Sequence, residues 1–184
     1  MIRGLVIASL FAAAPALAQT CDTVGDGVLF CPDDTPFAGN AGDYDPGMGV
    51  TFYQADTVML LTGPLPPFAY DVWVATPGDL SGAAETFPAQ ESVGIMDRPS
   101  VLGGDIPAET LTYMVQPDMI SLVTVIDLSG IPHLVQTVAI GIGPVENPLF
   151  ERFRNGIGTP LLHVICIGAP ARRTQECPSC IQKS

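Results

Sequence analysis

Cysteine is the residue type in this chain with the most chemistry to offer. There are five: Cys21, Cys31, Cys166, Cys177 and Cys180. In an oxidising compartment, disulfides are the first expectation for them. We expect Cys21 to bond to Cys31, closing a short loop, and Cys166 to pair with Cys177 or Cys180. The alternative pairs Cys177 with Cys180 and leaves Cys166 as a buried thiol. Because five is odd, one thiol stays free or two chains are linked.

The motif closest to redox chemistry is Cys177-Pro178-Ser179-Cys180. Proline at the second position of a β-turn brings the first and fourth Cα atoms within about 7 Å, a separation that a disulfide tolerates. The nearby Arg172, Arg173 and Lys183 favour a thiolate. A redox-active motif of this kind normally opens a helix, however, and four residues follow Cys180. A structural role is therefore favoured, and thiol–disulfide chemistry is the alternative function.

Residues 19–49 form an arm rich in Asp, Gly and Pro that invites a calcium interpretation. Its carboxylates are Asp22, Asp26, Asp33, Asp34, Asp43 and Asp45. Calcium prefers several carboxylate oxygens, but the spacing lacks a third loop acid, and Gln54 stands where the loop's glutamate would fall. Aspartates that form turns or face solvent are therefore favoured. Cation binding is a second alternative function, and no metal ligand is assigned.

The two histidines, His133 and His163, each lie in an apolar segment. Histidines satisfied by a neighbour are expected there rather than metal ligands or catalytic bases. The chain has no nucleophile elbow, zinc-protease motif, phosphate-binding loop or dinucleotide fingerprint. The sequence therefore assigns no catalytic residue and no cofactor, and a non-enzymatic role is favoured.

Residues 1–18 have the pattern of a secretory signal peptide. Arg3 supplies the positive start, an apolar run follows, and Ala16-Leu17-Ala18 predicts cleavage between Ala18 and Gln19. The apolar run is too short for a stable membrane-spanning helix. We therefore expect an exported protein, periplasmic or secreted, with no membrane insertion after the signal is removed.

The charge of the chain is strongly negative and uneven. The formal net charge is −12, and Arg98 is the single basic residue between Gln19 and Glu151. Such a charge repels phosphate backbones and anionic lipid, so nucleic acids and anionic membranes are excluded as expected partners. An unknown protein or small molecule is the expected partner.

The elements expected to position these residues are mainly strands. Strands are expected at 50–53, 57–61, 70–75, 92–96, 110–116, 119–128, 133–142 and 161–167. Within 110–116, Leu111, Tyr113 and Val115 alternate with polar residues, as in a half-buried strand. Ser129-Gly130 predicts an antiparallel hairpin between the next two strands.

Helical structure is expected in two short segments. A helical turn or two is expected at 80–87, and a helix from Asn147-Pro148 to Asn155-Gly156 that presses two Phe rings onto the sheet. The fold class is therefore α+β, a predominantly antiparallel sheet with one or two short helices packed on it. We expect one globular domain, 19–168, followed by a mobile tail, 169–184.

Three short motifs follow one another along the chain: Gly49-Val50-Thr51-Phe52, then Gly104-Asp105-Ile106-Pro107-Ala108 before a strand, and Leu149-Phe150 with Phe153 near the end. In this order they resemble the PsbP/DcrB-type fold. The resemblance covers roughly residues 47–156. It implies an antiparallel sheet flanked by helices and an accessory or binding role without catalytic residues. The expected function is thus an exported, non-enzymatic accessory or binding protein.

Overall fold

The structure is a computed structural model that describes residues 21–25, 28–97, 107–141 and 165–167. Its strands are β1 (Asp22–Gly25), β2 (Val28–Phe30), β3 (Asp43–Asp45), β4 (Val50–Ala55), β5 (Val58–Pro64), β6 (Ile95–Asp97), β7 (Ala108–Gln116), β8 (Met119–Asp127), β9 (Pro132–Ile140) and β10 (Ile165–Ile167). Its helices are the single 3₁₀ turn Pro32–Asp34, α1 (Pro67–Ala75) and α2 (Leu80–Gln90).

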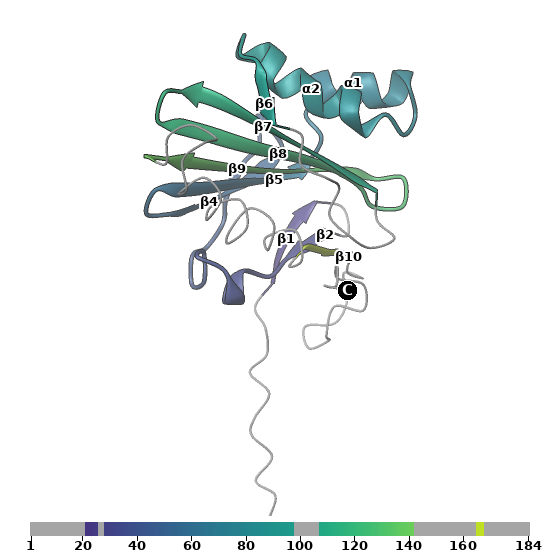
Figure 1. Ribbon diagram of the computed structural model, residues 1–184. Coiled ribbons are helices and arrows are strands. Elements are labelled where there is room, and N and C mark those ends of the chain that lie inside the picture. The colour runs from purple at the N-terminus through teal and green to yellow at the C-terminus, as the bar shows by residue number, and fades with distance from the viewer. Residues whose placement is uncertain (1–20, 26–27, 98–106, 142–164, 168–184) are drawn as a thin grey trace, which may run out of the picture.

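The strands form two antiparallel sheets. In the described residues, the larger has seven strands in the order β3-β4-β5-β9-β8-β7-β6, and the smaller has the order β1-β2-β10. Helices α1 and α2 cover one face of the larger sheet, and β1, β2 and β10 lie on the other side (Figure 1). The predicted fold class, an antiparallel α+β protein with short helices, is confirmed.

The β7–β8–β9 meander is where the sequence pattern was strongest, and both hairpins are present. The last pair before the β7–β8 turn is Gln116 with Met119, and the last pair before the β8–β9 turn is Asp127 with Pro132. Ser129 and Gly130 both have positive φ angles, 58° and 91°, as the predicted tight turn requires. The alternation predicted for β7 is correct, but the strand is buried on both faces rather than one, because both faces of the sheet are covered.

The segment 70–75, predicted as a strand, is instead the C-terminal part of α1. Pro67 stands at its first position, where the fixed φ of proline suits a helix. The backbone N–H groups of Ala69 and Tyr70 both donate to the carbonyl of Pro66. Ala69 is fully buried, and Trp73, one turn further along, packs against the same core as Ala69. Because a helix lets Ala69 and Trp73, four residues apart, pack into the same core, this segment is helical despite the β preference of its valine and aromatic side chains.

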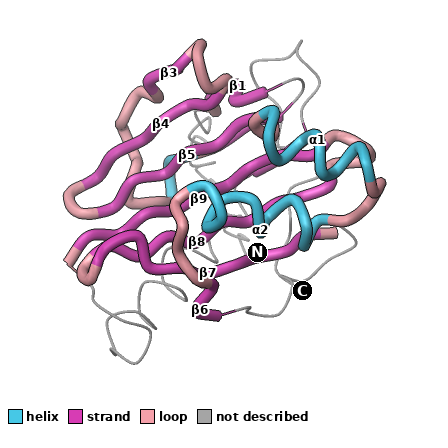
Figure 2. Tube along the Cα trace, turned by 90° about the horizontal axis from the view of Figure 1, so that it is seen from above, coloured by secondary structure: helices cyan, strands magenta, loops and turns pink. Residues whose placement is uncertain are grey.

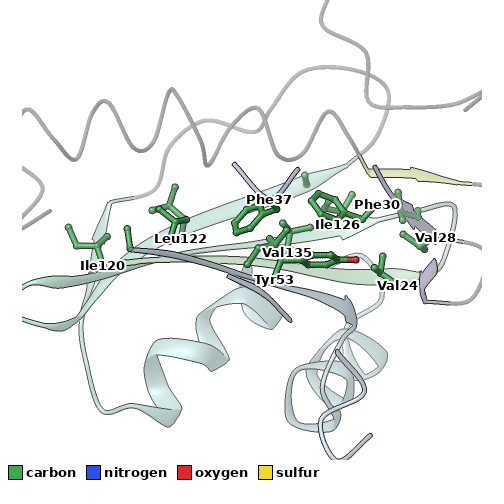
Figure 3. Packing of buried hydrophobic residues seen from close by; sticks show 14 residues of the cluster. Val24, Val28, Phe30, Phe37, Tyr53, Ile120, Leu122, Ile126 and Val135 are labelled. Carbon is green, nitrogen blue, oxygen red and sulfur yellow. The ribbon is translucent and has the colours of Figure 1, made fainter. Parts of the chain in front are cut away.

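The arm 19–49, expected to be irregular, contains β1, β2, the 3₁₀ turn and β3. Phe30 and Phe37 from the arm are fully buried against the larger sheet, where their rings lie 4.7 and 6.2 Å from that of Tyr53 (Figure 3). The part of the arm that carries Phe30 and Phe37 therefore packs on the larger sheet as a second layer, whereas β3 is an edge strand of that sheet. The helix expected at 147–156, the signal peptide 1–18 and the tail 169–184 lie outside the described residues, and β10 falls within the strand expected at 161–167.

Candidate functional site

The predicted disulfide between Cys21 and Cys31 is present. It joins the residue before β1 to the residue after β2, so it closes the β1–β2 hairpin at its open end. Cys166 lies on β10, in register with Leu29 of β2. Cys177 and Cys180 lie outside the described residues, as do Ala18 and Gln19, so the pairing of the tail and the cleavage site stay predictions.

Removing the disulfide should destabilise the protein measurably. For a loop of this length the chain-entropy model gives a loss of about 3 kcal/mol in the free energy of unfolding. We expect the double variant Cys21→Ser/Cys31→Ser to show this loss in urea denaturation under non-reducing conditions. Adding a thiol reductant should then lower the stability of the wild type much more than that of the double variant. Equal sensitivity of the two proteins would contradict the prediction.

Two aspartates of the arm, Asp22 and Asp45, have structural roles. The Asp22 carboxylate accepts a hydrogen bond from the Tyr53 hydroxyl at 2.8 Å. Burial raises the pKa of Tyr53, and the hydrogen bond and the charge of Asp22 raise it further. Asp45 accepts hydrogen bonds from the N–H groups of Gly47 and Met48, the turn-forming role expected of these residues. No cluster of three or more potential metal ligands occurs within 21–25, 28–97, 107–141 and 165–167.

His133 is fully buried on β9, facing the arm. Its Nε2 atom is hydrogen-bonded to the Thr62 hydroxyl at 2.9 Å. Its Nδ1 atom has no hydrogen-bond partner among the described residues and faces Gly25 of β1, where a Cβ atom would lie 3.5 Å away. Burial lowers the pKa of His133 to about 3, so the imidazole is neutral in the folded protein. His163 lies outside the described residues.

A buried hydrogen-bond network joins three central strands to the end of α2. The Gln136 amide donates to the Tyr113 hydroxyl at 3.0 Å and to the Ser121 hydroxyl at 2.9 Å. The Tyr113 hydroxyl donates to the Glu91 carboxylate, directly after α2, at 3.2 Å. Burial raises the pKa of Tyr113, and the negative charge of Glu91 adds to this effect, so the phenol stays a donor. The network fastens the C-terminal end of α2 to the sheet.

Helix α1 lies with α2 in the outer layer on its side of the molecule. Figures 1 and 2 show it beside α2, with no described element over its outer side. Of its nine residues, one, Asp71, is charged. A helix on the surface normally presents polar residues outward, whereas a helix apolar all round is normally buried. Apart from Asp71, helix α1 combines a largely apolar composition with a surface position.

Large apolar side chains are consequently exposed along α1. Phe68, Tyr70 and Val74 have 38%, 44% and 50% of their surfaces exposed. The Tyr70 ring stacks on that of Trp73 with centroids 5.9 Å apart, and the Phe68 ring meets the Phe87 ring of α2 edge-on at 5.2 Å. We call Phe68, Tyr70 and Val74, together with the half-buried Trp73 that stacks on Tyr70, the α1 patch. The two ring contacts join the patch within α1 and to α2.

The charges close to the α1 patch in sequence are all negative. The segment from Pro67 to Glu91 contains no Lys, Arg or His, and its acids are Asp71, Asp79, Glu85 and Glu91. Asp79 caps α2 by accepting a hydrogen bond from the Gly82 N–H, while Asp71 is exposed on α1 itself. The α1–α2 layer is thus an apolar patch on a segment of purely negative charge.

The α1 patch is not among the sites predicted from the sequence, which concern cysteine, aspartate and histidine. Tyr70 and Trp73 fall in the segment 70–75, which was predicted as a strand. The sequence feature that could have revealed the helix is the spacing of Leu65, Ala69 and Trp73 at four-residue intervals, which is typical of a helix with one buried side. With the helix recognised, the remaining apolar residues must lie on its outer side.

No described helix is both long and apolar enough to cross a bilayer. A scan against protein-family models found no match, and a search of curated proteins found none either. The resemblance to the PsbP/DcrB-type fold therefore stays a prediction.

Proposed function

We propose that this chain is an exported, non-enzymatic binding protein that uses the α1 patch as its binding surface. The observation that carries the proposal is the exposure of Phe68, Tyr70 and Val74 on a helix that packs beside α2 over the larger sheet. Contiguous exposed apolar side chains on a folded domain typically mark an interaction site, and aromatic residues contribute most of the energy at such sites.

Two further observations support the proposal. The Cys21–Cys31 disulfide fits an oxidising compartment, which agrees with the signal-peptide pattern of residues 1–18. The buried polar residues described above, His133 and the Tyr113 network, tie elements of the fold together and lie under covered faces of the sheet. Binding through the exposed helix thus accounts for the apolar side chains that the fold leaves exposed on α1.

Export is tested by expressing the full chain in a Gram-negative host and fractionating the cells. We expect the chain in the periplasm or medium with Gln19 as its first residue, shown by intact-mass measurement. An uncleaved chain confined to the cytoplasm would overturn this part of the proposal.

Use of the α1 patch is tested by photo-crosslinking in the same cells, with a photoreactive phenylalanine analogue at position 70, 74 or 57. Thr57 is the control because it is exposed in the β4–β5 turn, far from α1 in Figure 2. We expect crosslinked species from positions 70 and 74 but not from position 57. The same products from all three positions, or none from 70 and 74, would contradict a binding role for α1.

A further inference from the structure

We infer that the partner of the α1 patch is a cationic amphipathic segment of another protein, with apolar side chains on one side and Lys or Arg on the other. This inference rests on the proposed binding function and specifies its ligand. It follows from the combination of an apolar patch with a segment that carries acids and no bases.

The apolar half of the recognition comes from α1. Tyr70 and Val74 lie one helical turn apart, so they form a single stripe along the outer side of the helix. Trp73 stacks on Tyr70, and Phe68 extends the patch toward α2. A row of aliphatic or aromatic side chains spaced along a partner helix matches such a stripe.

The charged contacts with the partner would come from the acidic residues of α1 and α2. Asp71 lies on α1 between the patch residues in sequence, and Asp79, Glu85 and Glu91 follow on α2 and at its ends. Basic residues flanking the partner's apolar side would meet Asp71 on α1 itself, and the other acids make the charge of the layer negative. Charge complementarity of this kind speeds association and selects among partners.

The same charges disfavour the other occupants of an exposed apolar patch. A second copy of this chain would bring two molecules of net charge −12 together through acid-bearing layers, which is repulsive. An anionic lipid surface is disfavoured for the same reason. A cationic partner is the one for which both the apolar and the charged features are favourable.

Trp73 provides the readout for a direct test. It is the only tryptophan in the chain, and it is part of the patch, so its fluorescence reports on occupancy of α1. The probe is a Trp-free amphipathic peptide of Leu and Lys of about 18 residues, long enough to form a helix on binding. Its controls are a peptide with Glu in place of every Lys and a scrambled peptide of the same composition.

We expect the Leu/Lys peptide to change Trp73 emission in a saturable way, and the two control peptides to bind much more weakly. Raising NaCl from about 50 to about 300 mM should weaken binding several-fold by screening the charged contacts. The variant Tyr70→Ser/Val74→Ser should bind at least about tenfold more weakly, the loss typical of truncated contact residues. Asp71→Lys should also weaken binding and leave the apolar patch intact.

The matched control is Tyr44→Ser. Tyr44 is 61% exposed but lies on β3, in register with Thr51 on the arm side of the sheet, so its removal should leave binding unchanged. Circular dichroism and melting curves check that each variant is folded. Asp71→Lys keeps the test decisive if the double variant is unstable.

Three outcomes would overturn the inference: equal binding of the Glu peptide, equal weakening by Tyr44→Ser, or a Trp73 response to anionic vesicles or to protein concentration alone. A response to anionic vesicles would assign the patch to a membrane, and a response to protein concentration would assign it to a second copy of the chain. If the Leu/Lys peptide does not bind but positions 70 and 74 still give specific crosslinks, the cationic partner is rejected and the proposed binding function stands. If the peptide does not bind and positions 70 and 74 give no crosslinks, both proposals are rejected.

Discussion

Replacing Phe30 with alanine is expected to lower the free energy of unfolding by about 3 to 5 kcal/mol, the range for truncating a buried phenylalanine. Phe30 is fully buried, and its ring lies 4.7 Å from that of Tyr53 on β4. It belongs to β2, the central strand of the smaller sheet, so the cavity would form where the arm packs on the larger sheet (Figure 3). Urea denaturation of the oxidised protein measures the loss.

Leu29→Ala is the control for this prediction. Leu29 precedes Phe30 on the same strand, but it points the other way and is half-buried. Its truncation should cost clearly less, because fewer contacts are lost and solvent can fill the space. Equal losses for the two variants would mean that the arm is not held to the sheet through Phe30.

The elements that were predictable from sequence are those in which local pattern and tertiary burial agree. Strands β7, β8 and β9 alternate their side chains as expected, and Ser129-Gly130 supplies the turn between the last two. In β8, Val123 and Val125 face the helices while Leu122 and Ile126 face the arm, as the period-two pattern required. The pattern could not show that both sets would be buried, since this depends on what packs on each face.

Two segments were predicted wrongly for a common reason, which is that their conformation is set by the sheet they cover. Residues 70–75 have β-forming side chains, yet they form α1 because Ala69 and Trp73 pack down on the sheet. In the arm, Val28 and Phe30 form a strand within a segment whose Asp, Gly and Pro content suggested none. The disulfide there was predictable, since ten residues separate Cys21 from Cys31 and exported thiols are oxidised.

The candidate site was the least predictable part. Cysteine, aspartate and histidine stand out in a sequence because their chemistry is distinctive, but several of the described ones serve the fold: Asp22 accepts a hydrogen bond from Tyr53, and His133 is hydrogen-bonded to Thr62. The α1 patch consists of ordinary apolar residues. Such residues suggest function only when a structure leaves them exposed, and exposure of Tyr70 and Val74 depends on the orientation of α1 on the sheet.

The second large effect concerns pH. Burial lowers the pKa of His133 from its ordinary 6.5 to about 3, so the folded protein holds a neutral imidazole. In the unfolded chain the same imidazole takes up a proton below pH 6.5. Stability is therefore fully present above about pH 6.5 and is lost as the pH falls toward about 3. From pH 7.5 to 5.0 this group alone should lower the free energy of unfolding by about 2 kcal/mol.

The variant His133→Gln isolates this contribution, because glutamine keeps a hydrogen-bonding group near Thr62 but does not titrate. We expect the loss between pH 7.5 and 5.0, measured by urea denaturation at each pH, to shrink by about 2 kcal/mol relative to the wild type. His163→Gln is the matched control, since it removes the other imidazole of the chain. Because Nδ1 of His133 faces Gly25 on β1 and has no partner among the described residues, protonation requires the arm to open to water. A pH dependence that survives in His133→Gln, or disappears in His163→Gln, would show that the buried imidazole does not control acid stability.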